Sequence, residues 1–232
     1  MNHVSAAALR PLSGARERHG RIYRTIRDRI CLLEFEPGLK LSEVDLAREF
    51  GVSRTPVRQV LSRLEAEGLL ESRHGVGTFV TDVDIESLMP VFALRMELAE
   101  LIGKLDPVPP TKTGISRVRK LLARCDRMLD DPDPKAYARI NMEFFHELSA
   151  MTGNQPLREI SERLYFLTHR IWLKSVPHLN LRDELVVFRR EVSDIVAAME
   201  INDLEAVGHI RRSHISMSVK RMHRFAGEPQ AG

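Results

Sequence analysis

The sequence predicts a mainly α-helical protein with two parts, a winged helix-turn-helix followed by an all-α helical bundle. Residues 21–82 contain three short helical stretches and then two extended runs around a turn, which is the pattern of a winged helix-turn-helix. Residues 83–226 contain six amphipathic helical stretches, which favours a bundle. Residues 1–20 and 227–232 are expected to be a flexible arm and a tail.

The composition is typical of a globular protein, with 43% hydrophobic and 29% charged residues among 232. The net charge of +3 permits nucleic-acid binding without demonstrating it. The chain has no apolar run of membrane-spanning length and begins without the apolar core of a signal peptide. Cys31 and Cys125 lie far apart inside helical patterns, which is typical of reduced thiols. These features predict a cytoplasmic protein.

The helix-turn-helix is predicted from its boundary residues. A second short helix opens at Ser42, which has an acidic residue three positions later, and it ends at Gly51. A third helix opens at Ser53 and closes at Gly68. Residues 69–80 then hold two short extended runs around a Gly-x-Gly tip, so we expect a β-hairpin wing there.

The third helix carries two arginines four residues apart near its start, on the side opposite its apolar stripe. In a helix-turn-helix, the second helix of the motif enters the major groove and presents its N-terminal residues to base edges. An arginine fork matches O6 and N7 of guanine. We therefore predict DNA contacts from this helix by Ser53, Arg54, Thr55, Arg58 and Gln59.

The wing tip is the second predicted DNA contact, formed by Arg73, His74 and Gly75. A hairpin tip that carries a cation and a glycine can approach the adjacent minor groove or its phosphates. For both sets of residues, the alternative is that they are ordinary solvent-exposed side chains.

The stretch from Leu41 to Val80 contains GVSRTPVR, LSRLEAEGLL and GxGTFV, and it resembles the winged-helix domain of the GntR family. Residues 84–225 are similar to the FadR C-terminal (FCD) domain of that family. The resemblance implies a homodimeric transcription regulator, usually a repressor. It also implies release from a palindromic DNA operator when a small, commonly carboxylic, effector binds.

Many FCD domains hold a metal through one aspartate and three histidines. Carried over residue by residue, these four positions fall on Asn141, Phe145, Val192 and His214. Zinc needs three or four protein ligands, and only His214 is a typical one. We therefore predict no metal and no other cofactor. The predicted effector contacts are Arg95, Asn141 and His214, the polar residues at or near apolar helix faces.

Two of these assignments have alternatives within the helical bundle. A guanidinium is suited to binding a carboxylate, but Arg95 could instead pair with a neighbouring acid, Glu97 or Glu100. His214 could instead cap an internal polar network. His146 is expected to point outward because it lies opposite the apolar face of its helix. Arg163, Arg170 and Trp172 flank another apolar stripe and are weaker candidates for effector contact.

Two other functions are alternatives to a ligand-sensing regulator. His146-Glu147 resembles the start of a zinc-protease motif, but that motif requires a histidine where Ala150 stands, so we predict no enzyme. The second alternative is a ligand-independent DNA-binding regulator or architectural protein with a filled C-terminal core, and the sequence leaves this alternative open. For a sensing protein, the hypothesis is that the effector acts through the junction at residues 81–84. Effector binding would move the two recognition helices of the dimer, so that their separation no longer matches the distance between successive major grooves, about 34 Å.

Overall fold

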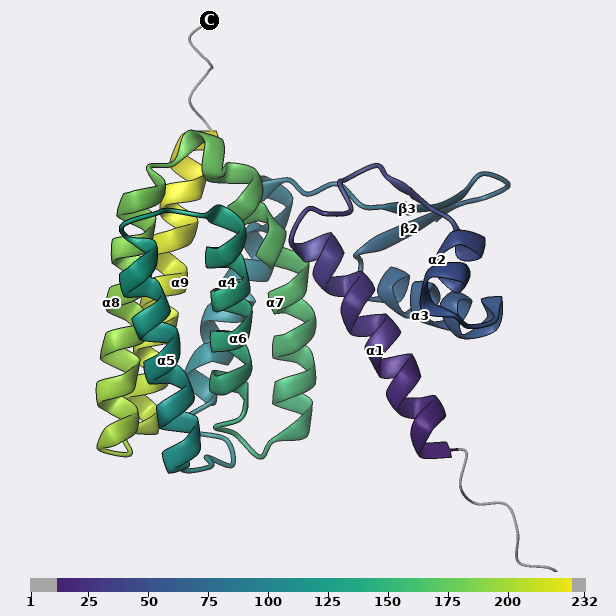
Figure 1. Ribbon diagram of the computed structural model, residues 1–232. Helices are drawn as coiled ribbons and strands as arrows, with labels where there is room; N and C mark the ends of the chain where they lie inside the picture. The colour runs from purple at the N-terminus through teal and green to yellow at the C-terminus, as the bar shows by residue number, and fades with distance from the viewer. Residues whose placement is uncertain (1–11, 227–232) are drawn as a thin grey trace, which may run out of the picture. The chain divides into compact units, whose positions relative to one another are not determined.

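The computed structural model describes residues 12–226 (Figure 1). The chain divides between Asp82 and Val83 into two compact units. The six N-terminal elements belong to the first unit and the remaining helices to the second. The tail expected at residues 227–232 lies outside the described residues.

The first unit is a three-helix domain with a small antiparallel sheet. Its strands lie in the order β1-β3-β2, and Lys40 of β1 faces Phe79 of β3. Strand β1 was not predicted, because two residues are too short to show the alternation that marks a strand. The elements are α1 (Leu12–Cys31), β1 (Lys40–Leu41), α2 (Glu43–Phe50), α3 (Arg54–Ala66), β2 (Leu70–Arg73) and β3 (Gly77–Val80).

Helix α1 begins earlier than the sequence predicted. The expected flexible arm covered residues 1–20, but residues 12–20 form the first turns of α1. This part of the helix has no apolar stripe, so its periodicity gives no helical signal, although Ala, Arg and Glu favour helix. Residues 1–11 of the expected arm lie outside the described residues.

The helix-turn-helix is fixed by its caps and by packing against α1. Ser42 Oγ accepts a hydrogen bond from the Asp45 backbone N at 3.2 Å, which confirms the predicted N-cap of α2. Gly51 ends α2 in the left-handed conformation with φ +62°, where a side chain would be strained. Helix α3 packs on α1. The buried apolar residues of these two helices include Ile22, Ile26, Ile30, Val57, Val60, Leu61 and Leu64.

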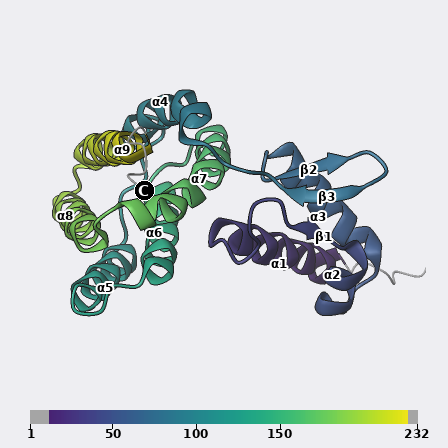
Figure 2. The same ribbon diagram turned by 90° about the horizontal axis from the view of Figure 1, so that it is seen from above.

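The second unit is a ring of six α-helices, as predicted in number. Viewed from above in Figure 2, they follow each other around the ring in the order α4, α9, α8, α5, α6, α7, and each packs on both of its neighbours. The helices are α4 (Ile85–Leu101), α5 (Lys112–Met128), α6 (Pro134–Ser149), α7 (Gln155–Ser175), α8 (Leu181–Glu200) and α9 (Leu204–Ala226), with a 3-10 turn, η1 (Val176–His178), after α7.

The ring closes where α9 meets α4, and two glycines allow the close approach. A Cβ atom on Gly208 would lie 2.9 Å from the backbone oxygen of Ala99, and one on Gly103 would lie 2.2 Å from that of Leu204. Helices that are adjacent in space but distant in sequence therefore enclose the centre of the unit. No helix within residues 12–226 is both long enough and apolar enough to cross a membrane.

Candidate functional site

All five residues predicted to contact DNA from α3 are exposed in the first unit. They lie on or just before the first turns of the helix, opposite its buried stripe. Ser53 has the backbone conformation of an N-cap, but its side chain makes no capping hydrogen bond. The hydroxyl of Ser53 is therefore not used to cap the helix, contrary to the expectation from its residue type.

The two arginines of α3 converge on one carboxylate. Glu43, in the first turn of α2, accepts hydrogen bonds from Arg54 Nη2 at 2.9 Å and from Arg58 Nε at 3.1 Å. The hydrogen bond from Arg58, and to a smaller extent that from Arg54, lowers the pKa of Glu43. The arginine side chains stay 58% and 64% exposed, so they remain available to a partner. Sequence reasoning missed Glu43, because it lies 11 and 15 residues from the arginines.

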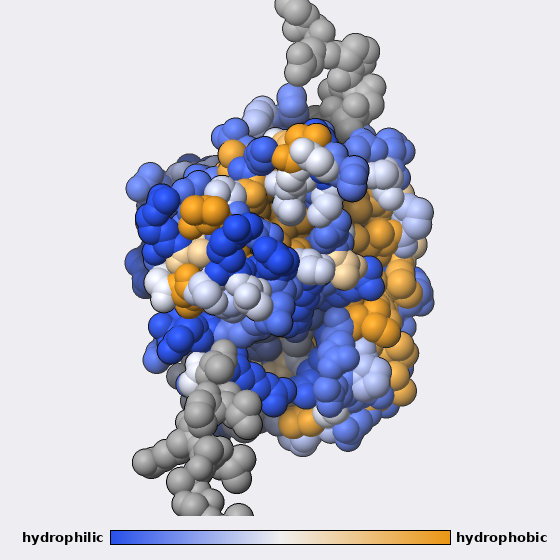
Figure 3. All heavy atoms as spheres, turned by 90° about the vertical axis from the view of Figure 1, so that its right-hand side faces the viewer, coloured by the Kyte–Doolittle hydropathy of each residue, from blue (hydrophilic) through white to orange (hydrophobic). Residues whose placement is uncertain are grey.

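The wing places its cation beside an aromatic ring. The guanidinium of Arg73 lies 4.4 Å from the centre of the Phe79 ring, and its Nη2 donates to Glu71 Oε1 at 2.7 Å. Gly75 adopts φ +70° in the turn, which favours glycine. His74 is exposed beside it. Hydrophilic side chains predominate on the side of this unit that faces the viewer in Figure 3.

The second unit contains a cavity of about 70 Å³ inside the helical ring. Its lining comes from α4, α6, α7, α8 and α9. The three residues predicted to contact an effector, Arg95, Asn141 and His214, all line it. The structure thus brings together three residues that are far apart in the sequence.

Arg95 enters the cavity as a cation without an acidic partner. Its Nη1 donates to Thr168 Oγ1 at 2.6 Å, and its guanidinium lies 5.3 Å from the centre of the Tyr165 ring. Among the described residues, no carboxylate forms an ion pair with it. Burial, followed by repulsion from Arg211, lowers the pKa of Arg95 to about 9. The side chain therefore remains charged at neutral pH.

The alternative partners suggested for Arg95 are engaged elsewhere. Glu97 and Glu100 both form ion pairs with Arg212, at 3.0 Å and 2.7 Å. Glu100 also pairs with Lys104 at 3.3 Å. The expectation that Arg95 could pair with one of these acids is therefore wrong.

The other two predicted residues also have polar neighbours in the cavity. Asn141 Oδ1 accepts a hydrogen bond from the Tyr165 hydroxyl at 2.8 Å. His214 Nδ1 lies 3.9 Å from Glu191 Oε2. Burial lowers the pKa of His214, so the imidazole is neutral at neutral pH.

Two ion pairs in the cavity wall were not foreseen. Arg211 Nη1 donates to Glu191 Oε1 at 2.6 Å, and Arg221 Nη2 donates to Glu184 Oε2 at 2.9 Å. Together with Arg95, three guanidinium groups face two carboxylates, which leaves one positive charge. In the sequence, the two glutamates lie seven positions apart within the apolar pattern of α8, and this spacing was the available signal.

The cavity also contains a donor with no partner. The indole of Trp172 is 8% exposed and stacks on Tyr137 with ring centres 3.9 Å apart. Its Nε1 makes no hydrogen bond to any group in the described part of the chain. A buried donor of this kind is normally satisfied by a protein group, water or ligand.

The side chains at the four expected metal positions do not form a metal site. Phe145 stacks on Tyr165 with ring centres 3.9 Å apart, and Val192 is fully buried. Among residues 12–226, no three His, Cys, Asp or Glu side chains are grouped so that they could hold an ion. Only Asn141 and His214 could offer a ligand atom at these positions.

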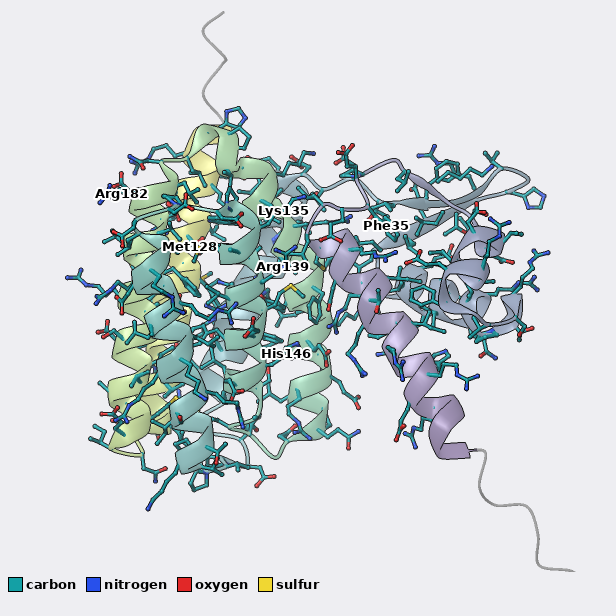
Figure 4. All side chains as sticks on the ribbon, in the orientation of Figure 1. Phe35, Met128, Lys135, Arg139, His146 and Arg182 are labelled. Atoms are coloured by element: carbon teal, nitrogen blue, oxygen red, sulfur yellow. The ribbon has the colours of Figure 1, made fainter. Side chains whose placement is uncertain are left out.

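His146 lies outside this cavity. It is exposed on α6 together with Lys135 and Arg139, which share the outer face of that helix (Figure 4). The prediction that His146 points outward is confirmed.

A winged helix-turn-helix joined to a helical ring around a charged cavity defines a class of bacterial DNA-binding regulators. Comparison with known families agrees: residues 18–80 match the bacterial regulatory proteins of the gntR family, and residues 91–217 match the FCD domain. The chain belongs to the gntR family and carries an FCD domain. It is a DNA-binding transcriptional regulator and not an enzyme.

Individual relatives agree with this assignment. The chain is 30% identical over 165 residues to the Nta operon transcriptional regulator of Aminobacter aminovorans, covering 68% of this chain and 78% of that protein. It is 23% identical to the HTH-type transcriptional repressor RspR of Escherichia coli K12, covering 87% and 88%. It is also 25% identical to YdhC of Bacillus subtilis, and that match covers 63% of this chain and 66% of YdhC.

A solved structure has the same fold. McbR/YncC of Escherichia coli superimposes with a TM-score of 0.76 and 19% identity, over 89% of this chain and 97% of that one. This likeness extends through both parts of the chain and supports the assignment of the fold.

Proposed function

We propose that this regulator reads a palindromic operator as a homodimer. In each protomer, Arg54 and Arg58 contact base edges, with Ser53, Thr55 and Gln59 at the same face. The exposure of all five side chains supports this assignment. Residues Arg73, His74 and Gly75 of the wing contact the neighbouring groove or its phosphates. Because its target is chromosomal DNA, the protein acts in the cytoplasm.

The dimer follows from the strength of single contacts. Each good bidentate base contact contributes about 1–3 kcal/mol of discrimination, which is little for one small module. A second half-site on the same dimer raises avidity by about 10²–10⁴. Sedimentation of the purified protein, alone and with a palindromic duplex, tests this. A monomer that binds one half-site as tightly as the full site would contradict the proposal.

The regulator is a repressor that releases its operator when a small carboxylate binds inside the helical ring. The observation that carries this proposal is Arg95, a cation at the cavity that has no acidic partner among the described residues. A buried charge without a counter-ion is unfavourable, and a guanidinium binds a carboxylate through two parallel hydrogen bonds. The relative RspR of Escherichia coli K12 is a transcriptional repressor, which agrees with this direction of control.

The chemistry of the cavity supports an anion rather than a neutral ligand. The wall carries one surplus positive charge, and Trp172 Nε1 offers a further unpaired donor. The cavity of about 70 Å³ is roughly half of the ~150 Å³ that holds a benzene molecule in a protein core. The effector is therefore compact, with its carboxylate held by Arg95 and with Asn141 and His214 beside it.

The effector is held without a metal ion. This follows from the side chains at the four expected positions, of which Phe145 and Val192 have no ligand atoms. Adding zinc or a chelator to the purified protein should leave its melting temperature and carboxylate affinity unchanged. A zinc-dependent rise in melting temperature that is lost in His214→Gln would contradict this part of the proposal.

A thermal-shift screen of small carboxylates, each beside its uncharged amide, tests the effector site. A bound ligand raises the melting temperature by mass action. Carboxylates should stabilise the protein and release it from operator DNA, whereas the amides should not. Arg95→Ala should abolish both effects and keep operator binding. Arg212→Ala, a control on the outer side of α9 with a 41% exposed side chain, should respond like wild type.

The alternative function is a regulator or architectural protein that senses no ligand. A core of that kind would be filled, whereas this one contains a cavity. If no small carboxylate changes the melting temperature, or if Arg95→Ala retains the full response, the alternative is favoured.

A further inference from the structure

The first unit contains a hollow of about 500 Å³ between the start of α1 and the turn that joins α2 to α3. Its polar lining comes from Arg18 and His19 of α1, Arg48 of α2 and Ser53, which precedes α3. The rest of its lining is Ala47, Gly51, Val52 and Pro56. Among the described residues that line the hollow, two are arginines and none is acidic. Its surface is therefore positively charged.

Arg18 carries a charge that no acid in the described part of the chain neutralises. It is exposed, and within residues 12–226 it forms no hydrogen bond and no ion pair, not even with its exposed neighbour Glu17. Arg48 pairs with Asp45 at 3.0 Å, but its side chain is 75% exposed. Because an exposed pair contributes only about 1 kcal/mol or less, Arg48 can exchange Asp45 for another anion.

The hollow lies beside the part of α3 that is expected to read bases. Ser53 lines it and directly precedes Arg54. Pro56 also lines it, and it is two residues from both Arg54 and Arg58. Since successive residues of a helix are about 100° apart, Pro56 lies on a different side of α3 from both arginines. An anion in the hollow therefore flanks the base-reading face of the helix.

We propose that this hollow binds one phosphate of the DNA backbone at the edge of the major groove that α3 enters. This inference rests on the proposed position of α3 in that groove. Arg18 donates charge-assisted hydrogen bonds to the phosphate, and Arg48 and the uncapped hydroxyl of Ser53 lie beside it. The hollow is larger than the ~150 Å³ that holds benzene, so a phosphate and bridging water fit.

A phosphate contact of this kind positions the recognition helix and carries no sequence information. The first turns of α1, which the sequence gave no sign of, therefore extend the DNA-binding surface beyond the helix-turn-helix and the wing. Arg18 is a positioning residue, and its loss should weaken binding to every DNA sequence by a similar factor.

The first test is the salt dependence of DNA binding by full-length Arg18→Gln, measured by fluorescence anisotropy with a selected duplex and an unrelated one. Each neutralised phosphate of B-DNA contributes about 0.9 to the slope of log affinity against log salt. The slope should fall by about 0.9, so the deficit relative to wild type should shrink roughly three- to fourfold between about 50 and 200 mM salt. The preference for the selected duplex should not change.

Two further variants control for net charge and for the contact itself. Arg24→Gln makes the same charge change on the same helix, at an exposed residue that does not line the hollow. It should keep the wild-type slope. Arg18→Lys keeps the charge and should also keep the slope. All three variants should melt with the wild type, because the substituted residues are exposed.

The second test locates the phosphate. The selected duplex is prepared with one uncharged methylphosphonate at a time, and each duplex is bound to wild type, Arg18→Gln and Arg24→Gln. At one position in each half-site, the substitution should weaken wild type and Arg24→Gln but have no further effect on Arg18→Gln. A contact that the variant has already lost cannot be lost again.

The outcomes separate this inference from the proposed reading of bases. Equal losses for Arg18→Gln and Arg24→Gln, with no phosphate position that distinguishes them, would show an effect of net charge alone and overturn the phosphate site. A changed site preference in Arg18→Gln with an unchanged salt slope would also overturn it. Neither result affects base reading by Arg54 and Arg58, which is contradicted only if their own variants keep the wild-type site preference.

Discussion

Arg58 Nε donates a hydrogen bond to Glu43 Oε1 at 3.1 Å, which joins the start of α3 to the start of α2. Arg54 is held by the same carboxylate at 2.9 Å. Glu43 therefore fixes the positions of both guanidinium groups before DNA is bound. In the proposed DNA complex, Glu43 would compete with DNA for the two arginines and would place a negative charge close to the phosphates.

Glu43→Gln should raise the affinity for non-specific DNA, because the variant lacks the carboxylate that repels phosphates. The preference for a selected site over non-specific DNA should fall, since the arginines lose a fixed partner. Folding stability should change by about 1 kcal/mol or less, as is usual for exposed ion pairs. Fluorescence anisotropy with both duplexes measures the two affinities. Glu36→Gln, with the same charge change at an exposed loop position, is the control. If both variants bind alike, Glu43 has no special role.

Arg73→Ala in the wing should weaken binding by a similar factor for every DNA sequence. A phosphate contact carries no base information, and its loss lowers the slope of log affinity against log salt by about 1. The measurement is binding to selected and non-specific duplexes over a range of salt. An unchanged salt slope together with a changed site preference would show that Arg73 reads bases instead.

Arg211→Met should strongly destabilise the fold, because it leaves Glu191 buried without a counter-charge. The two side chains are 9% and 6% exposed, and breaking a buried pair from one side costs about 3–5 kcal/mol. Arg119→Met removes an exposed pair with Glu200 and should cost about 1 kcal/mol or less. Urea unfolding of both variants provides the comparison. Similar losses for the two would contradict the burial argument.

Protonation of His214 should reduce stability at acidic pH. Burial lowers its pKa in the folded protein below the usual value of about 6.5. Below that pH the unfolded chain binds a proton that the folded protein does not, so stability falls as the pH falls. His214→Gln should therefore lose less stability than wild type between about pH 7.5 and pH 5.5 in urea unfolding. His74→Gln, at an exposed position in the wing, should follow wild type; identical pH profiles for all three proteins would refute this.

Much of the fold could be predicted because local signals and the global fold agree. Apolar residues at helical spacing and boundary residues such as Ser42 and Gly51 marked the helices. Residues 12–20 and strand β1 were missed for the same reason. Neither has a periodic apolar pattern: residues 12–20 are the polar first turns of α1, and β1 is two residues that pair with β3.

The candidate cavity was predicted only in part. Arg95, Asn141 and His214 were found because each is a polar residue near an apolar face. Glu191 and Arg211 were not, because a buried ion pair looks like two ordinary surface charges until the helices are placed side by side. The cavity itself could not be foreseen at all, since a cavity depends on how side chains from several helices fail to fill the space between them.

The central claim is that Arg54 and Arg58 read the bases of the operator. It is tested most directly by replacing both with alanine and measuring affinity, at physiological salt, for a duplex selected by the wild-type protein and for an unrelated duplex. The account predicts that affinity for the selected site falls about 5- to 150-fold for each arginine, the equivalent of the 1–3 kcal/mol of a bidentate contact, while the unrelated duplex is affected much less. A double variant that folds normally and keeps the wild-type preference for the selected site would contradict it.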